Sequence, residues 1–460
     1  MKMIYNVSDR PKFGQVIVFA IQQLLAIMAA TLVVPVITGH GMSSAAALFG
    51  AGVGTLVYLA FTKMKSPVFL GSSFAFLGSM AAAFAGGVST QLGFMGLILG
   101  AVFAGLVYVV IAIIVKFVGV GWINKLMPPV VIGPTVAIIG LSLAGNAIGD
   151  LQTGGVKNAE QVSTGNVLLC VVIGLITLAV TMLCSTFGKK TARLIPFIIG
   201  ILAGYAVAAV FTVIGISTDN PALQIVNFSY FSALVENGVT LGTFFALPDF
   251  TFLTAFGAVG ELNGAYIGTI AVAYAPVAFV VFAEHIADHK NISSIIEKDL
   301  LEEPGLHRTL LGDGIGSMVG ALFGGCPNTT YGESVACVAI TRNASVVTIL
   351  AAAIGAIIVS LLNPFVAFVN SIPACVMGGV CMALYGFIAV SGLKMIQKVN
   401  LEENKNLFVV SAILIAGVGG LTLTFGQVKI TAVACALILG ILSNLMLSSK
   451  KTEENTEEAE

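Results

Sequence analysis

The sequence holds few charged residues, few histidines and no paired cysteine motif. Asp, Glu, Lys and Arg make up 9% of its 460 residues, whereas about 25% is usual in soluble globular domains. The net charge of −1 lacks the basic excess of nucleic-acid-binding proteins, so no nucleic-acid partner is expected. The seven cysteines are scattered, which argues against a disulfide or metal framework. With 57% hydrophobic residues and a mean hydropathy of +1.02, the chain is predicted to be a polytopic membrane protein.

Hydropathy predicts an all-α fold with fourteen transmembrane segments, since a spanning helix needs about 20 apolar residues. Eleven segments are strong, and they lie near 14–38, 44–62, 92–115, 129–148, 166–184, 194–216, 266–289, 344–369, 373–393, 406–422 and 430–448. Three are short or broken, at 66–87, 310–325 and 332–342. A partly apolar segment at 217–265 holds four acids and no basic residue, and it is expected outside the membrane.

The basic residues indicate the orientation of these segments. If the N-terminus is cytosolic, 19 of the 21 Lys and Arg residues fall in cytosolic segments, and only Lys157 and Lys429 fall outside. Cytosolic loops of membrane proteins are enriched in Lys and Arg. Removing one span would reverse every later loop and destroy this pattern. We therefore expect a multi-pass protein of the cytoplasmic membrane, with a retained cytosolic arm at 1–13 instead of a signal peptide and a disordered cytosolic tail at 450–460.

Two of the broken segments share one pattern. "SPVFLGSSF" at 66–74 and "CPNTTYGE" at 326–333 each place a proline and extended-type residues before a small residue that opens a short helix. They are the third and tenth predicted spans, and the odd interval of seven inverts the second half of the chain relative to the first. Interrupted helices at matching positions of inverted repeats point to the midplane binding site of a transporter.

Three acids lie within predicted spans, where ionisable residues are rare and functional by default. Glu284 and Asp288 are four residues apart in "FAEHIADH", so they share a helix face. Glu333 would open a half-helix whose unpaired N–H groups point into the membrane. Such a site suits a small planar solute that carries both donors and acceptors. The structural alternatives are that Asp288 ends its helix among the headgroups and that Glu333 is a first-turn acid of an external loop.

His285 and His289 form a second pair four residues apart, on another face of the same predicted helix. Two histidines and acids on one helix can bind zinc, which leaves an intramembrane metalloenzyme as an alternative. The spacing is not that of an HExxH motif, and no second cluster of ligands accompanies the pair. We therefore predict neither a metal site nor an enzyme.

Longer stretches resemble a known family. "FAEHIADH", "EPGLHRTLLGDGIGSMVGALFGGCPNTTYGES" and "VMGGVCMALYG" are similar to the nucleobase–ascorbate transporters, closest to the uracil-transporting members of bacteria, and the likeness covers nearly the whole chain. The resemblance implies two inverted repeats of seven helices with short strands in spans 3 and 10. It also implies a core domain of 14–128 and 266–370 and a gate domain of 129–265 and 371–449.

The resemblance implies a function as well. Members of the uracil type are proton symporters and often dimers. The expected function is proton-coupled import of uracil by alternating access, with no cofactor, and with a homodimer in the bilayer. Asp288 or Glu284 would carry the proton. By position, the implied substrate-binding residues are Glu284, Glu333, Phe74, Tyr331, Gly332 and Tyr385.

The sequence departs from the family pattern near the expected site. The first-span Gln-His pair is Gln22-Gln23 here. Where some uracil-type members have a histidine, this sequence has Asp288, as xanthine- and urate-type relatives do. Where the family signature has an asparagine and a glycine, this sequence has Ser334 and Ala336. Two further alternatives stay open: the same machinery moving xanthine, urate or another nucleobase, and a uniporter or channel of the same fold.

Overall fold

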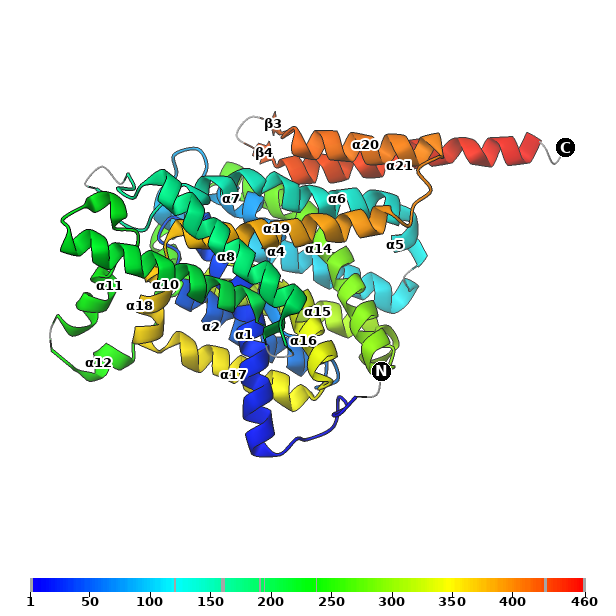
Figure 1. The fold of residues 1–460 in the computed structure, drawn as a ribbon. Helices are drawn as coiled ribbons and strands as arrows, with labels where there is room; N and C mark the ends of the chain where they lie inside the picture. The colour runs from blue at the N-terminus through cyan, green and yellow to red at the C-terminus, as the bar shows by residue number, and fades with distance from the viewer. Residues whose placement is uncertain are drawn as a thin grey trace.

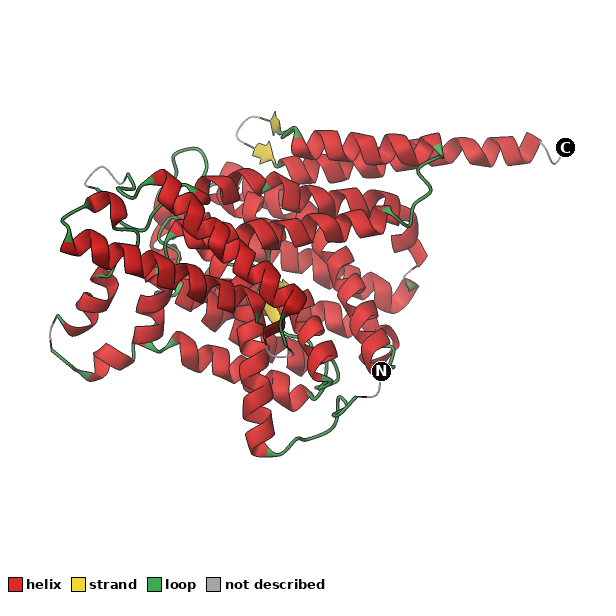
Figure 2. Cartoon of the chain, viewed as in Figure 1, coloured by secondary structure: helices red, strands yellow, loops and turns green. Residues whose placement is uncertain are grey.

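A computed structural model of the chain describes residues 3–119, 121–158, 162–189, 192–193, 195–236, 238–425 and 428–457. Helices dominate this part of the chain, and the few strands, yellow in Figure 2, are short. Eight of its helices are long and apolar enough to cross a membrane. The predicted class, an all-α polytopic membrane protein, is therefore confirmed.

The elements fall into three stretches of chain. The first contains α1 (Phe13–Thr38), α2 (Ser44–Phe61), β1 (Leu70–Ser72), η1 (Phe74–Phe76), α3 (Leu77–Ala83), α4 (Thr90–Val118), α5 (Gly121–Leu126), α6 (Pro129–Ser142), α7 (Ala144–Leu151), α8 (Val167–Phe187) and α10 (Pro196–Ser217). The second, expected outside the membrane, contains the short helices η2 (Pro221–Leu223), α11 (Ser229–Ser232), η3 (Ala233–Val235), α12 (Leu241–Phe244), α13 (Thr251–Ala255) and η4 (Phe256–Glu261). The third contains α14 (Gly264–Ile296), η5 (Leu301–Gly305), α15 (Leu306–Gly324), β2 (Asn328–Thr330), α16 (Gly332–Thr341), α17 (Val346–Ser360), α18 (Asn363–Ser371), α19 (Ala374–Ile396), α20 (Asn404–Val418), β3 (Leu423–Phe425), β4 (Val428–Ile430) and α21 (Ala432–Glu457).

Side-chain caps fix where several long helices begin. Ser43 Oγ accepts from Ala46 N–H at 3.2 Å and begins α2, and Asn263 Oδ1 accepts from Tyr266 N–H at 2.9 Å and begins α14. A cap satisfies an N–H group that has no acceptor within the helix, and removing one costs about 1 kcal/mol. These polar residues therefore punctuate a sequence whose apolar runs give little indication of helix ends.

Several helix boundaries differ from the sequence predictions, and three of these differences have a physical reason in the structure. The span predicted at 344–369 is two helices, α17 and α18, because Pro364 stands at the start of α18, where its missing N–H is tolerated. Helix α14 continues to Ile296, beyond the predicted end at 289, because its polar His285 and His289 are buried by partners from other helices. Helix α21 continues to Glu457, where we predicted a disordered tail; Glu and Lys are good helix formers.

The long helices pack as two groups. In the first group α2 packs on α15, α17 and α1, and α4 packs on α14 and α15. In the second group α6 packs on α19, α20 and α21, and α8 packs on α10 and α19. Figure 1 shows α6, α19, α20 and α21 running side by side. The α2–α15 contact is close, since a Cβ on Gly50 would lie 2.3 Å from Gly320 O; small residues permit such packing in membranes.

Strands β1 and β2 join the two halves of the chain inside the first group. They pair antiparallel, with Leu70 opposite Thr330 and Ser72 opposite Asn328, and all their residues are buried. Each strand leads at once into a short helical element, η1 and α3 after β1, and α16 after β2. The crossing therefore interrupts both helical segments at one point of the bundle.

The N-terminal arm is tied to the loop that follows α16. Ile4 N–H donates to Arg342 O at 2.8 Å, and Ala344 N–H donates to Tyr5 O at 2.9 Å. Val346 N–H donates to Val7 O at 3.2 Å, and the Val7 side chain is buried in a cluster with α1 and α17. The arm thereby links the beginning of α1 to the end of the half-helix α16.

Replacing Val7 with aspartate is expected to lower the melting temperature of the detergent-purified protein by several degrees. The substitution places an unpaired polar group in an apolar cluster, at a cost of about 2 kcal/mol. Ser8→Asp is the matched control, since Ser8 is exposed beside it and gains the same charge. Equal melting temperatures for the two variants would show that the arm does not stabilise the bundle.

Candidate functional site

A cavity of about 560 Å³ lies where the two packing groups meet, within the range of roughly 300–1,000 Å³ typical of small-molecule sites. The first group contributes Ala26, Ser73, Phe74, Ala75, Glu284, Ala287, Asp288, Thr329, Thr330, Tyr331, Gly332, Glu333, Ala336, Cys337 and Ile340. The facing wall, largely from α6, α10 and α19, is more apolar and includes Val136, Ile139, Phe197, Leu384, Phe387 and Ile388. One wall is therefore polar and acidic, and the other could cover the flat face of a small ring.

The strand crossing brings the beginnings of two short helices to this cavity. Ser73 N–H donates to Pro327 O at 2.9 Å, and Tyr331 N–H donates to Phe69 O at 3.2 Å, so hydrogen bonds extend beyond both ends of the strand pair. Phe74 then begins η1 and Gly332 begins α16. The first N–H groups of a helix have no acceptor within it, and the end they occupy is electropositive. The crossing thus offers N–H donors to a solute in the cavity.

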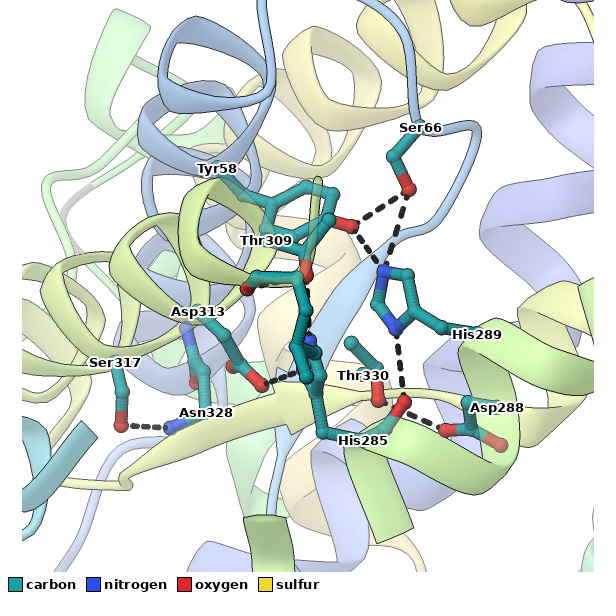
Figure 3. Close-up of polar contacts among 11 residues, drawn as sticks. Tyr58, Ser66, His285, Asp288, His289, Thr309, Asp313, Ser317, Asn328 and Thr330 are labelled. Atoms are coloured by element: carbon teal, nitrogen blue, oxygen red, sulfur yellow. Dashed lines mark hydrogen bonds and ion pairs between the residues drawn. The ribbon is translucent and has the colours of Figure 1, made fainter. Parts of the chain in front are cut away.

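The three predicted acids line the same cavity. Glu284 and Asp288 come from α14, and Glu333 from the first turn of α16. Thr330 Oγ1 donates to Asp288 Oδ2 at 2.8 Å, which links the end of β2 to α14 (Figure 3). A Cβ on Gly332 would lie 3.7 Å from Asp288 Oδ1, so the start of α16 is close to Asp288. The structure therefore brings together acids that are 45 to 49 positions apart in the sequence.

Tyr331 is held by the opposite strand. Its hydroxyl donates to Ser72 O at 2.6 Å, and its ring lies against Gly71, where a Cβ would come within 2.5 Å of two ring carbons. The ring borders the cavity but is fixed in place by these contacts. Tyr331 therefore shapes the site as a rigid wall.

Replacing Gly71 with alanine is expected to destabilise the protein by about 1–3 kcal/mol, because the added methyl group overlaps the Tyr331 ring. The thermal unfolding temperature measures this effect. Gly78→Ala is the matched control, since Gly78 lies in the adjacent α3 and its Cβ would meet no atom within 4 Å. Equal unfolding temperatures for the two variants would contradict the tight contact.

Phe74 lines the cavity, whereas Tyr385 is not among the described residues of its wall. Tyr385 is buried in α19 and meets Phe74 edge-on, with ring centroids 5.9 Å apart. Tyr385 therefore contacts a residue of the cavity wall without lining the described cavity itself, and its role at the substrate site stays a prediction.

The two histidines of α14 are not among the residues that line the cavity; they belong to a buried polar network (Figure 3). His285 Nδ1 lies 2.7 Å from Asp313 Oδ2, and its Nε2 lies 3.0 Å from Thr309 Oγ1. His289 Nδ1 donates to His285 O at 2.8 Å, and its Nε2 lies 2.7 Å from the Tyr58 hydroxyl. All four ring nitrogens thus have protein partners, and the described residues contain no group of three or more His, Cys, Asp or Glu placed to hold a metal.

Sequence reasoning missed several polar contacts around the site. Asp313 is an acid within an apolar segment, so the rule that selected Glu284 could have found it. The Gln23 amide donates to Ser334 Oγ, which also accepts from Phe69 N–H at 3.1 Å. Gln23 and Ser334 are both departures from the family pattern, and they contact one another. No local signal in the sequence indicates this pair, because their positions are 311 residues apart.

Two cavity hydroxyls are also notable. Ser73 Oγ and Thr329 Oγ1 are buried and have no hydrogen-bond partner within the described ranges, and both residues line the cavity. A buried polar group without a partner costs roughly 1–3 kcal/mol. A solute with polar edges could supply that partner.

A polytopic helical bundle with an acidic cavity at the crossing of two interrupted helices is the architecture of a membrane transporter. The sequence matches the permease family over residues 14–425. The chain therefore belongs to this family of permeases, which are transporters and not enzymes, and its resemblance to the nucleobase–ascorbate transporters is confirmed.

Three relatives show how far the similarity extends. The uracil permease of Bacillus caldolyticus is 37% identical over 453 residues, which cover 98% of this chain and 96% of the relative. The uracil permease of Bacillus subtilis (strain 168) is 36% identical over 458 residues, or 98% and 97% of the two chains. The uracil permease of Escherichia coli (strain K12) is 36% identical over 460 residues, or 99% and 97%.

Solved structures resemble the chain in fold alone. The transmembrane domain of a cyanobacterium bicarbonate transporter, BicA, has a TM-score of 0.62 at 13% identity and covers 95% of this chain and 99% of its own. SLC26A9 has a TM-score of 0.63 at 12% identity and covers 96% and 67%. Both are similar over nearly the whole of this chain.

Proposed function

We propose that the protein imports uracil across the cytoplasmic membrane together with a proton. The observation that carries this proposal is the shared cavity of Glu284 and Glu333, in a chain 36–37% identical to uracil permeases over almost its full length. The two carboxylates come from α14 and α16, elements that the strand crossing holds together.

The groups in the cavity match those of uracil. Uracil is neutral at pH 7 and carries two N–H donors and two carbonyl acceptors. Glu284 and Glu333 accept from the ring N–H groups, and the helix-start N–H groups at Phe74 and Gly332 donate to the carbonyls. Hydrogen bonds to charged groups contribute roughly 1.5–3 kcal/mol each. Phe74 covers a face of the uracil ring. Tyr331 is fixed against β1, so Phe74 is the aromatic residue that we assign to this role.

Accumulation of a neutral solute requires a coupled ion. Three acids share the cavity, and ionised carboxylates at this depth repel one another, which favours a state with one of them protonated. Asp288 or Glu284 carries the coupled proton. No further cofactor is needed, because both substrate and proton bind to side chains of the protein.

The proposed architecture of the protein is two inverted repeats of seven spans. The described residues supply eight long apolar helices and five shorter ones, at 74–83, 332–341, 346–360, 404–418 and 432–448. Helix α15 would complete fourteen. Antiparallel pairing of β1 with β2 suits two halves of opposite orientation. The first packing group lies within the proposed core domain of 14–128 and 266–370, and the second lies largely within the proposed gate domain of 129–265 and 371–449. The short helices α13 and η4, which fall within the proposed gate range, pack on α4 of the first group.

Alternating access follows from motion of these domains against each other. The cavity extends toward Arg193 and Met395, near the ends of helices where the basic residues gather. That face is cytosolic under the positive-inside rule, as are both termini, so this conformation is open inward. A homodimer would leave the cavity within each protomer.

Competition between nucleobases tests the proposed substrate. Labelled uracil is taken up by vesicles containing the protein, and unlabelled uracil, thymine, xanthine, urate and adenine are added in turn. Uracil is expected to compete best. The alternative substrate class, xanthine or urate, is favoured by Asp288, and stronger competition by xanthine or urate than by uracil would replace the proposal with it.

A further inference from the structure

A second cavity, of about 370 Å³, lies on the other side of Phe74. Its described lining is Ile37, Thr38, His40, Phe74, Ala75, Leu77, Gly78, Ala81, Phe84, Ile139, Ser142, Leu143, Asn146, Thr431, Ala432 and Val433. Three of these residues, Phe74, Ala75 and Ile139, also line the acidic cavity. The two cavities therefore share a thin partition built from η1 and α6.

The cavities lie toward opposite ends of the α6–α19 pair. The two helices are antiparallel, since a Cβ on Gly133 would meet Met395 and Ile396 and one on Gly140 would meet Tyr385 and Ala389. The acidic cavity extends along α19 to Met395, at the beginning of α6. The second cavity extends past the end of α6, at the opposite end of the pair.

Other helix ends agree with this placement. The second cavity is bordered by the end of α1, the residue after α3 and the beginning of α21. The acidic cavity reaches Ser185 near the end of α8 and Arg193 before α10. His40, Ser142 and Asn146 are exposed, so the second cavity is open at its far end.

We propose that the second cavity is an external vestibule that binds a planar nucleobase on its way to the acidic site, and that Phe74 and Ile139 form the septum that closes it in this conformation. The inference rests on the proposed nucleobase import for its ligand. The position of the septum rests on the two cavities alone.

The lining of the vestibule suits such a ligand. The rings of His40 and Phe84 are stacked, with centroids 4.0 Å apart and planes inclined by 4°, and they form a flat surface in its wall. Base–aromatic stacking contributes roughly 1–3 kcal/mol. The Asn146 amide in the same lining offers donors and an acceptor. The Thr38 and Ser142 hydroxyls donate to Val34 O and Ile139 O, so they offer acceptors. A neutral ring with polar edges can bind there without a charged partner.

The septum couples the vestibule to the gate. Phe74 belongs to η1 of the first packing group, and it contacts Tyr385 of α19 in the second. Ile139 belongs to α6, which packs along α19. Sliding of one group past the other would therefore separate Phe74 from Ile139 and Tyr385 and join the vestibule to the acidic cavity.

Sided labelling of introduced cysteines tests this assignment. Asn146→Cys is placed in the vestibule and Ser391→Cys in the acidic cavity, and each is treated with a membrane-impermeant maleimide in right-side-out and inside-out vesicles. The wild-type protein gives the background of its seven native cysteines, of which six are buried. We expect the Asn146→Cys variant to react from outside and the Ser391→Cys variant from inside. Reaction of Asn146→Cys from the inside only would overturn the proposal.

A second variant tests the septum itself. Ile139→Ala is combined with Ser391→Cys, and Val136→Ala with Ser391→Cys is the control, since Val136 lines the acidic cavity alone. Outside labelling should rise severalfold in the Ile139 variant and not in the control. Equal outside labelling of the Ile139 variant and the Val136 control would contradict the septum.

Protection by uracil separates the two claims. Uracil added outside should slow labelling of Asn146→Cys severalfold. If Asn146→Cys reacts from outside as expected but only another nucleobase slows the reaction, uracil import is overturned and the vestibule is supported. If no nucleobase slows the reaction in a protein that takes up uracil, the binding role of the vestibule is overturned and uracil import is supported.

Discussion

Replacing Glu333 with glutamine is expected to weaken uracil binding by roughly 10- to 100-fold, while the protein stays folded. In the proposed complex the Glu333 carboxylate accepts a hydrogen bond from a ring N–H group of uracil. Losing the charge on an acceptor of this kind costs roughly 1.5–3 kcal/mol, which corresponds to that range. The amide also presents an N–H group toward the N–H edge of the ring, where it finds no acceptor. Binding of labelled uracil to the purified protein measures the change.

The control for this prediction is Glu302→Gln. Glu302 lies in η5, is exposed and undergoes the same chemical change away from the cavity. Its affinity for uracil should equal that of the wild type. The assignment of Glu333 to the substrate site would be wrong if the Glu333→Gln variant bound uracil within a factor of about two of the wild type at an unchanged melting temperature. Such a factor corresponds to under about 0.5 kcal/mol of binding free energy.

Replacing Glu284 with glutamine is expected to abolish uptake driven by a pH gradient. Glu284 has two proposed roles, one as an acceptor for the substrate and one as a candidate carrier of the proton. If Glu284 is the proton carrier, an imposed gradient no longer drives uptake in this variant, because glutamine cannot exchange a proton in the physiological range. Vesicles with this variant should show the same uracil uptake with and without the gradient, and a wild-type response would contradict the assignment.

Asp288→Asn separates the two candidate carriers. The amide oxygen of the introduced asparagine could still accept from Thr330 Oγ1, so the contact between α14 and β2 can persist. If Asp288 carries the proton, this variant should exchange labelled uracil for unlabelled uracil but not accumulate it. If Glu284 carries the proton, accumulation by the Asp288→Asn variant should persist.

The sequence predicted those features of the site that depend on single residues or on short stretches of chain. The acids at 284, 288 and 333 stand out in apolar surroundings, and all three line one cavity. The prolines and extended-type residues at 66–74 and 326–333 indicated breaks, and β1 and β2 occur there. Hydropathy placed the end of α14 too early, because His285 and His289 are polar and their burial depends on partners in α15 and α2.

Tertiary contacts account for what the sequence could not show. Tyr331 is turned onto β1 because Gly71 leaves space for its ring, and neither residue signals the other. The Gln23–Ser334 contact and the Asp313–His285 contact likewise join separate helices. The second cavity depends on how η1, α6 and α21 assemble, so it has no counterpart in any single motif.

Proton-driven accumulation of uracil by the reconstituted protein decides whether it is a proton symporter for uracil. Purified protein is reconstituted into proteoliposomes, and labelled uracil is added outside at a pH below that of the lumen. We expect uracil to accumulate above the external concentration, and the accumulation to collapse when a protonophore dissipates the gradient. Uracil uptake by the wild-type protein that stops at equal concentrations, with or without the gradient, would contradict proton-coupled import.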